Sequence, residues 1–204
     1  MKLLKMIPES PNERFIDIAV DALRRGEIII YPTDTLYALG CNALNNNAIE
    51  RICRLKGMKS DKTSLSIICE DISEIAKYAK LSNTQFRLLK DNLPGPFTFI
   101  LPAFSKLPKA FKGRKEVGVR IPDNAIAMAL VKALGNPIMT TSVGRDVDED
   151  DYMCEPELIA ERYINDVSVV IDAGRGKTEP STIVDCTADS GEPEIVRQGL
   201  GTLE

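Results

Sequence analysis

The stretch "YPTDTLYALGC", residues 31–41, follows the apolar run "EIII" and holds two threonines and an aspartate. The segment "EIIIYP" is typical of a strand that ends at its proline. Polar side chains directly behind a strand form either a turn or the wall of a ligand site. Because ligands gather where strands end in open α/β sheets, we expect this stretch to be one wall of a pocket.

Helical and strand patterns alternate on both sides of this stretch. Apolar residues at helical spacing predict a helix that begins at the N-cap Asn12 and ends at Gly26. Further helices are predicted over 45–57, 71–80, 83–92, 124–135 and 156–164, and strands over 65–70, 97–102, 116–122, 137–143, 167–174, 181–187 and 194–199. No helix separates the last three strands, so the pattern favours an α/β domain with a mixed sheet. No linker divides the chain, and residues 1–204 are predicted to form one domain with its core over about 12–200.

The composition is ordinary for a globular protein, with 44% hydrophobic and 27% charged residues. No apolar run approaches the roughly 20 residues that cross a bilayer, and the N-terminus lacks the pattern of a secretory signal. The five cysteines are scattered and include no CxxC pair. We therefore expect reduced thiols, mostly in the core, and a cytoplasmic protein with no membrane partner.

Missing residue types exclude several functions. The chain has no histidine, which excludes Ser-His and Cys-His catalysis and every His-ligated metal site. It has no tryptophan and only 5% aromatic residues, fewer than a base-stacking RNA platform requires. The net charge of −4 disfavours coating of nucleic acid by bulk electrostatics and leaves a local basic patch open.

Two motif-like segments fail on their spacing. In "AGRGKTEPS", residues 173–181, a phosphate-binding P-loop would need a glycine where Ile171 stands, so a plain loop is predicted. The run "RDVDEDDYMCEPE", residues 145–157, holds seven acidic residues but lacks the central glycine of a calcium loop. It is predicted to be a solvated loop.

The run "KLPKAFKGRK", residues 106–115, carries five basic side chains in ten. Such a run usually lies on the surface of a protein, with its side chains exposed to solvent. The alternative is contact with RNA phosphates through Lys109, Lys112 and Arg114.

Polar side chains recur at the ends of predicted strands. Arg120 and Arg197 lie near the ends of "VGVRIP" and "EIVRQG", where a guanidinium could hold a carboxylate or a phosphate through two hydrogen bonds. The alternative for each arginine is a surface salt bridge. Four hydroxyl residues also stand at or just past strand ends: Thr33, Thr35, Ser142 and Ser181. Together they predict a polar pocket for an anionic small molecule or a nucleotide.

Seven segments, taken in order, resemble the YrdC/YciO family. They are "YPTDTLYALGC", "RICRLKG", "LPGPFTFIL", "VGVRIPDN", "PIMTTSV", "PSTIVD" and "IVRQG". The resemblance runs from about residue 15 to residue 199, nearly the whole chain. Catalytic relatives usually have Tyr-Gly-Leu-Gly where this chain has "YALGC", which is closer to the YciO branch. The resemblance implies a single YrdC/RibB-like α/β domain whose twisted mixed β-sheet is flanked by helices and has a concave, positively charged face.

The resemblance also implies a reaction, in which L-threonine, bicarbonate and ATP give threonylcarbamoyl-AMP and pyrophosphate for the threonylcarbamoyladenosine modification of tRNA. Thr35, Arg120 and Ser181 would then bind L-threonine. Lys56, Ser142 and Arg197 would face the nucleotide. No residue is assigned as catalytic, because positioning and charge stabilisation dominate nucleotidyl transfer. Mg²⁺ would enter with ATP, held mainly by the phosphates, so no metal site of the protein's own is predicted.

Two positions depart from the synthase pattern. The family's Lys-x-Arg reads Lys56-Gly57-Met58 here, and its Ser-x-Asn reads Ser142-Val143-Gly144. A charge-assisted hydrogen bond is worth roughly 1.5 to 3 kcal/mol, so the absent arginine alone would slow turnover about ten- to a hundredfold. We therefore expect a nucleotidyltransferase of weak or altered activity. The alternative is a non-catalytic protein of the same fold that binds double-stranded RNA, tRNA or the ribosome.

Overall fold

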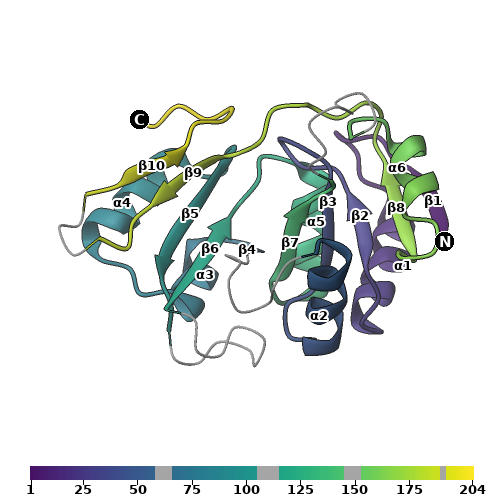
Figure 1. Ribbon diagram of the computed structural model, residues 1–204, viewed down its shortest axis with the longest axis horizontal. Helices are drawn as coiled ribbons and strands as arrows, with labels where there is room; N and C mark the ends of the chain where they lie inside the picture. Colours follow the sequence, from purple (N-terminus) through teal and green to yellow (C-terminus); the bar gives the residue numbers. More distant parts are fainter. Residues whose placement is uncertain (58–65, 105–114, 145–152, 189–191) are drawn as a thin grey trace.

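Ten strands form one mixed sheet in the part of the chain that the structure describes, a computed structural model covering residues 1–57, 66–104, 115–144, 153–188 and 192–204. Figure 1 shows their order, β1-β8-β2-β3-β7-β4-β6-β5-β9-β10, from right to left. The strands are β1 (Lys2–Lys5), β2 (Ile29–Tyr31), β3 (Ala38–Asn42), β4 (Ser66–Ile68), β5 (Phe97–Pro102), β6 (Glu116–Arg120), β7 (Ile138–Ser142), β8 (Val169–Asp172), β9 (Thr182–Asp185) and β10 (Glu194–Arg197). The flanking helices are α1 (Glu13–Arg24), α2 (Asn46–Leu55), α3 (Ile72–Tyr78), α4 (Asn83–Asn92), α5 (Ala125–Leu134) and α6 (Pro156–Arg162). The predicted α/β class and mixed sheet are confirmed.

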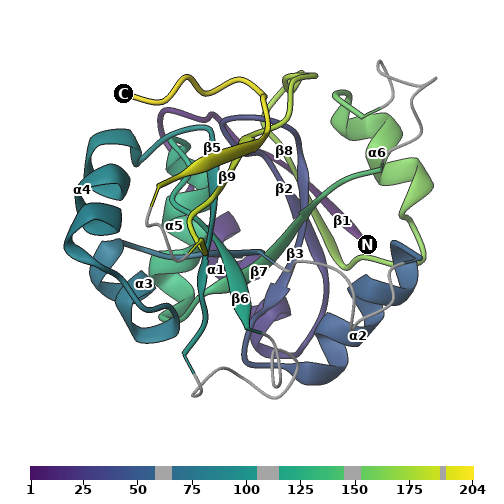
Figure 2. The same cartoon turned by 60° about the vertical axis from the view of Figure 1, so that its left-hand side comes forward.

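Strands that are distant in sequence lie side by side. β8 pairs in parallel with both β1 and β2, whereas β9 pairs in parallel with β5 at the other end of the sheet. The last three strands therefore do not form one hairpin series, although no helix separates them. Figure 2, turned by 60°, shows the strong twist of the sheet.

The helices begin and end at the residues that cap them. The Asn12 side chain accepts the backbone N–H of Phe15 at 3.3 Å, which confirms the predicted start of α1. Ser82 and Gln85 form a capping box at the start of α4, which satisfies two backbone donors that the first turn leaves free. α5 ends at Gly135, whose φ of 78° is a left-handed conformation that favours glycine.

Two strands were not predicted. β3 lies within the opening stretch, between β2 and β7, and is buried on both faces apart from its last residue. A short strand buried on both faces has no alternation of polar and apolar residues, which is the pattern that identifies most strands. β1 is a four-residue edge strand, and its sequence "KLLK" is too short to show a period.

The two faces of the sheet belong to different buried clusters. Ile30 and Leu39 pack with residues of α2, α3, α4 and α6. Ile29 and Tyr31 pack instead with residues of α1 and α5, on what we call the α1/α5 face. Successive residues of a strand point to opposite faces, so the single β2 contributes to both clusters.

The α1/α5 face becomes polar beyond those two helices. Arg120 is the register partner of Ile68, which packs in the α1/α5 cluster, so both side chains leave the sheet on this face. Thr140 lies two residues beyond Ile138 of the same cluster, and Thr98 alternates with the oppositely directed Phe99. Polar side chains from β5, β6 and β7 therefore share one face of the sheet.

The cysteines are core residues, as predicted. All five are buried and none forms a disulfide: Cys41, Cys53, Cys69, Cys154 and Cys186. Burial raises the pKa of the Cys186 thiol to about 11, so it stays protonated at neutral pH. Within the described residues, no helix combines the length and the hydropathy that a membrane crossing needs.

Candidate functional site

A buried ion pair joins the opening loop to the end of β6. Arg120 Nη2 donates to Asp34 Oδ1 at 2.9 Å and to the Thr35 hydroxyl at 3.1 Å. The other carboxylate oxygen of Asp34 accepts the backbone N–H of Asp123 at 3.1 Å. Asp34, Thr35 and Arg120 are each less than a tenth exposed. Arg120 is therefore not the surface salt bridge that the sequence left as an alternative.

One donor of Arg120 has no partner. Its Nε is fully buried and makes no hydrogen bond. Burial lowers the pKa of the Arg120 guanidinium, and the Asp34 carboxylate opposes this effect, so the arginine remains a cation. Leaving a buried charged donor without an acceptor costs more than about 1 to 3 kcal/mol, and such groups call for a specific explanation. A bound ligand that accepts a hydrogen bond from this arginine would be such an explanation.

The loop that carries Asp34 and Thr35 is held by its own side chains. The Thr33 hydroxyl donates to the Leu36 carbonyl at 2.7 Å and accepts the Thr35 backbone N–H at 3.0 Å. Before the loop, the Tyr31 hydroxyl donates to Thr140 Oγ1 of β7 at 2.8 Å. These bonds fix the direction of the loop across the polar part of the α1/α5 face.

Tyr37 anchors the other end of the loop. Its hydroxyl donates to the Gly174 carbonyl at 2.8 Å and accepts the Ala173 backbone N–H at 3.0 Å. Burial raises the pKa of Tyr37 to about 12, so the phenol is neutral at physiological pH. A Cβ on Gly176 would lie 2.7 Å from the Tyr37 ring, so the chain passes close over it. The segment that mimics a P-loop is thus a loop, as predicted, and it packs on this tyrosine.

Ser181 and Arg197, from the C-terminal part of the chain, reach the α1/α5 face next to Thr98 of β5. The hydroxyls of Thr98 and Ser181 share a hydrogen bond of 2.9 Å. Arg197 donates to the Ser181 carbonyl from Nε at 3.2 Å and from Nη2 at 2.7 Å. Thr98 also lies beside Arg120 on neighbouring antiparallel strands, because Phe99 pairs with Val119. The residues Thr35, Arg120, Thr98, Ser181 and Arg197, which we call the polar row, therefore run continuously across the sheet.

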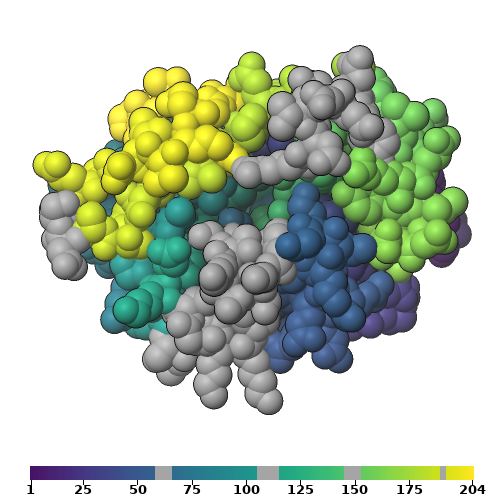
Figure 3. Space-filling view, in the orientation of Figure 1, coloured from purple at the N-terminus to yellow at the C-terminus, as the bar shows by residue number. Residues whose placement is uncertain are grey.

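A second pair adjoins the polar row. Lys56, directly after α2, donates from Nζ to the Ser142 carbonyl at 3.0 Å. Ser142 pairs in register with Ala38, and the next residue, Val143, donates its backbone N–H to the Tyr37 carbonyl at 2.9 Å. Lys56 and Ser142 are thus tied to the same loop as Thr35. Figure 3 shows the molecule hollowed between α2 (blue) and the C-terminal residues (yellow).

The six site residues predicted from strand ends and resemblance lie in these two groups. Contacts run from Thr35 through Arg120 and Thr98 to Ser181 and Arg197, so residues from both ends of the chain lie along one face of the sheet. Their roles toward a ligand stay predictions. Asp34 and Thr98 were not singled out, although each stands in a quoted motif. Asp34 is significant only because it pairs with Arg120, which is distant in the sequence. Thr98 could have been found as the polar residue within the apolar strand β5.

Several predicted features lie outside the described residues. They are Met58, the RNA-contact candidates Lys109, Lys112 and Arg114, and residues 145–152 of the acidic run. Gly144, which replaces the family's asparagine, is described and has a φ of 49°. A Cβ there would lie 2.7 Å from Met153 Sδ, so an asparagine would require that side chain to move.

Carboxylates are scarce around the polar row. Within the described ranges, no group of three or more Cys, Asp or Glu residues could hold a metal ion. Asp34, the buried carboxylate next to the row, accepts hydrogen bonds from Arg120 and from the Asp123 backbone.

A family model covers most of the chain. Residues 21–199 match the Sua5/YciO/YrdC model, which carries the description "telomere recombination". The chain belongs to the Sua5/YciO/YrdC family. The resemblance seen in the seven motifs is thereby confirmed.

Individual relatives agree with this assignment. The uncharacterized protein YciO of Escherichia coli (strain K12) is 40% identical over 202 residues, which span 97% of this chain and 95% of that protein. The threonylcarbamoyl-AMP synthase of Pyrococcus abyssi is 30% identical over 208 residues, spanning 100% of this chain and 59% of that protein.

Solved structures support the same fold. The crystal structure of E. coli YciO superposes with a TM-score of 0.90 at 38% identity and covers 98% of this chain and 97% of its own. P. abyssi Sua5 complexed with L-threonine superposes with a TM-score of 0.84 at 28% identity, covering 98% of this chain and 58% of its own.

Proposed function

We propose that this protein is a threonylcarbamoyl-AMP synthase-like nucleotidyltransferase that uses L-threonine, bicarbonate and ATP. The observation that carries the proposal is the buried Arg120 cation, whose Nε lacks a partner beside the Thr35 hydroxyl. Relatives about 30% identical are named threonylcarbamoyl-AMP synthases, and one relative of the same fold is known in complex with L-threonine.

The polar row suits an amino acid that carries a carboxylate and a hydroxyl. Arg120 offers a desolvated cationic donor, and charge-assisted hydrogen bonds to carboxylates are among the strongest in proteins. Thr35, Thr98 and Ser181 place hydroxyls on either side of it. In this assignment Thr35, Arg120 and Ser181 hold the L-threonine substrate.

The nucleotide would bind next to the residues that hold L-threonine, at basic side chains that can face its phosphates. In this proposal Lys56 and Arg197 would neutralise phosphate charge, with Ser142 beside Lys56. The threonine amine first attacks the bicarbonate carbon, which forms a C–N bond and releases water. A carbamate oxygen then attacks the α-phosphorus of ATP, and pyrophosphate leaves with the electrons of the broken P–O bond. Mg²⁺ carried by ATP would neutralise charge on the phosphates. Positioning and charge stabilisation suffice for such transfer, and neither step needs a histidine.

The test is incubation of the pure protein with ATP, bicarbonate and labelled L-threonine, followed by detection of labelled adenylate and pyrophosphate. Thr35→Val should lower product formation strongly, because it removes the hydroxyl and keeps the side-chain shape. Thr187→Val is the matched control, since its hydroxyl bonds only to Asp185 in a partly buried turn after β9. Absence of both products, with P. abyssi Sua5 active alongside, would contradict the proposal.

The two departures from the synthase pattern give a gain-of-function test. Met58→Arg combined with Gly144→Asn should raise adenylate formation by about tenfold or more, since one charge-assisted hydrogen bond is restored. Asparagine tolerates positive φ better than most residues, and adding Met153→Ala makes room for its side chain. No gain in the triple variant would indicate that the pocket serves other chemistry.

A further inference from the structure

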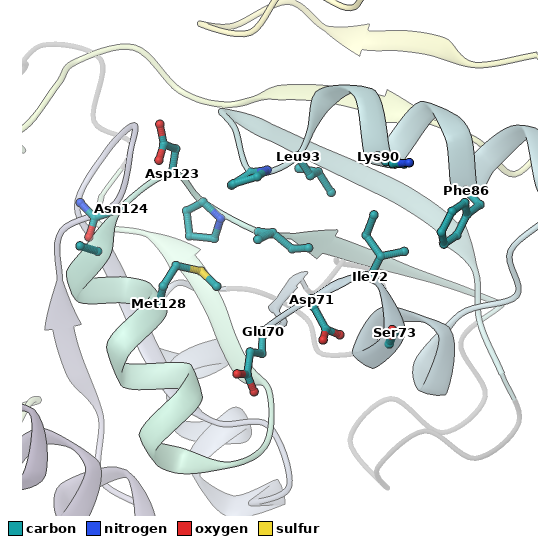
Figure 4. Close-up of a pocket in the computed structure, with 14 residues that line it drawn as sticks. Glu70, Asp71, Ile72, Ser73, Phe86, Lys90, Leu93, Asp123, Asn124 and Met128 are labelled. Atoms are coloured by element: carbon teal, nitrogen blue, oxygen red, sulfur yellow. The ribbon is translucent and has the colours of Figure 1, made fainter.

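An apolar groove lies outside the polar row, between α3, α4 and the start of α5. Its volume is about 580 Å³. The apolar lining of what we call the α4–α5 groove includes Ile72, Phe86, Leu93, Ile121, Pro122 and Met128. Figure 4 shows how the labelled side chains Ile72, Phe86, Leu93 and Met128 lie around this groove. The Phe86 side chain is exposed, with 47% of its surface accessible. An exposed phenylalanine beside an open apolar groove favours contact with another molecule.

The rim of the groove is acidic. Glu70, Asp71 and Asp123 border it, and among the residues that the structure describes Lys90 is the one cation in its lining. These carboxylates disfavour phosphate-bearing occupants such as nucleic acids or anionic lipids, because like charges repel. They favour cationic groups placed next to apolar ones.

The groove shares a backbone segment with the polar row. Ile121 and Pro122 line the groove and directly follow Arg120. The backbone N–H of Asp123 donates to Asp34 Oδ2, the oxygen that does not bond to Arg120. A partner that presses on this segment would therefore act on the hydrogen bonds of the Asp34–Arg120 pair.

We propose that the α4–α5 groove binds an extended segment of a partner protein in which apolar side chains alternate with lysine or arginine. The apolar side chains fill the groove and the basic ones meet Glu70 and Asp123. Because residues 121–123 connect the two places, occupancy of the groove changes the surroundings of Arg120. This docking surface does not depend on the proposed synthase activity.

Fluorescence anisotropy with short capped peptides tests the docking. A labelled peptide of alternating lysine and leucine should bind, whereas a peptide with serine in place of leucine and one with glutamate in place of lysine should bind at least tenfold more weakly. Equal binding of the lysine–serine peptide would reduce the interaction to non-specific attraction by an acidic protein and overturn the proposal.

Variants locate the binding. Glu70→Gln with Asp123→Asn should weaken binding roughly fivefold, as expected for two exposed charge pairs. Ala125→Phe, at an exposed position that lines the groove, should block the apolar side chains. The matched control is Glu50→Gln with Glu161→Gln, two exposed charges on α2 and α6. Equal losses in the two charge variants, or unchanged binding in Ala125→Phe, would contradict the assignment to this groove.

Nuclear magnetic resonance tests the connection to Arg120. The buried Nε–H of Arg120 should shift when the lysine–leucine peptide saturates the protein, and the shift should vanish in Ala125→Phe. The Nε–H signal of exposed Arg14 serves as the reference. Saturation without a shift at Arg120 refutes the connection.

Discussion

Two parts of the α1/α5 face, side by side on one sheet, differ in what they bury. Under α1 and α5 the face is closed by apolar side chains such as Ile29, Ile138 and Leu130. Along the polar row the buried groups are threonines, a serine and the Asp34–Arg120 pair. In the first part the buried side chains are apolar and only pack against one another, whereas the second part leaves a charged donor without an acceptor. Burial serves stability in the first part, and we propose that it serves ligand binding in the second.

The largest effect on folding is expected from Asp34→Asn. The substitution removes the counter-charge of a buried guanidinium, and breaking a buried pair in this way costs about 3 to 5 kcal/mol. Urea unfolding measures the loss. Glu157→Gln removes the partner of Lys5 in an exposed pair of similar length, 3.1 Å, and should cost much less, because exposed ion pairs contribute little to stability. Equal costs would mean that burial of the pair has no energetic consequence.

Truncation in the apolar part should separate stability from binding. Leu130→Ala removes a fully buried side chain between α5 and the sheet and should cost about 2 to 5 kcal/mol. Thermal stabilisation by L-threonine with ATP should persist in this variant at a temperature where it is folded. Loss of that stabilisation would show that the two parts of the face are not independent.

High pH tests the anchor of the opening loop. Tyr37 in the unfolded chain titrates near 10.0, whereas burial raises its pKa in the folded protein to about 12. Between these values the unfolded state binds fewer protons, so stability falls as the pH rises, by roughly 2 to 3 kcal/mol over the window. In Tyr37→Phe the decline between pH 10 and 12 should be smaller by this amount. Identical pH profiles of unfolding would argue against a neutral, buried phenol at this position.

The smallest effect on folding is expected from the substitutions that test the RNA-binding alternative. Neutralising Lys109, Lys112 and Arg114 should leave stability unchanged. If these residues contact phosphates, the dependence of log affinity for double-stranded RNA on log salt should become shallower by about 2 to 3. The control neutralises three exposed charges elsewhere, Lys2, Arg14 and Lys132. Equal slopes in both variants would reject the alternative.

Most of the fold followed from local patterns. α4 runs over the predicted residues because Ser82 and Gln85 specify its start. β3 was missed because a strand buried on both faces has no alternation, and because it contains Gly40. That glycine is required by tertiary packing, since a Cβ there would lie 2.5 Å from the Tyr31 ring.

The candidate site was only partly predictable. Thr35 and Arg120 could be found because polar residues at strand ends are conspicuous in the sequence. Asp34 became meaningful only through Arg120, which lies 86 positions away. Partners at such separation are brought together by sheet order, which local sequence does not specify.

The most direct measurement is a crystal structure of the protein with L-threonine and a non-hydrolysable ATP analogue. The account predicts that the threonine carboxylate lies within hydrogen-bond distance of the Arg120 guanidinium and that the phosphates face Lys56 and Arg197. L-threonine bound elsewhere, or a polar row unchanged at ligand concentrations that saturate P. abyssi Sua5, would contradict it.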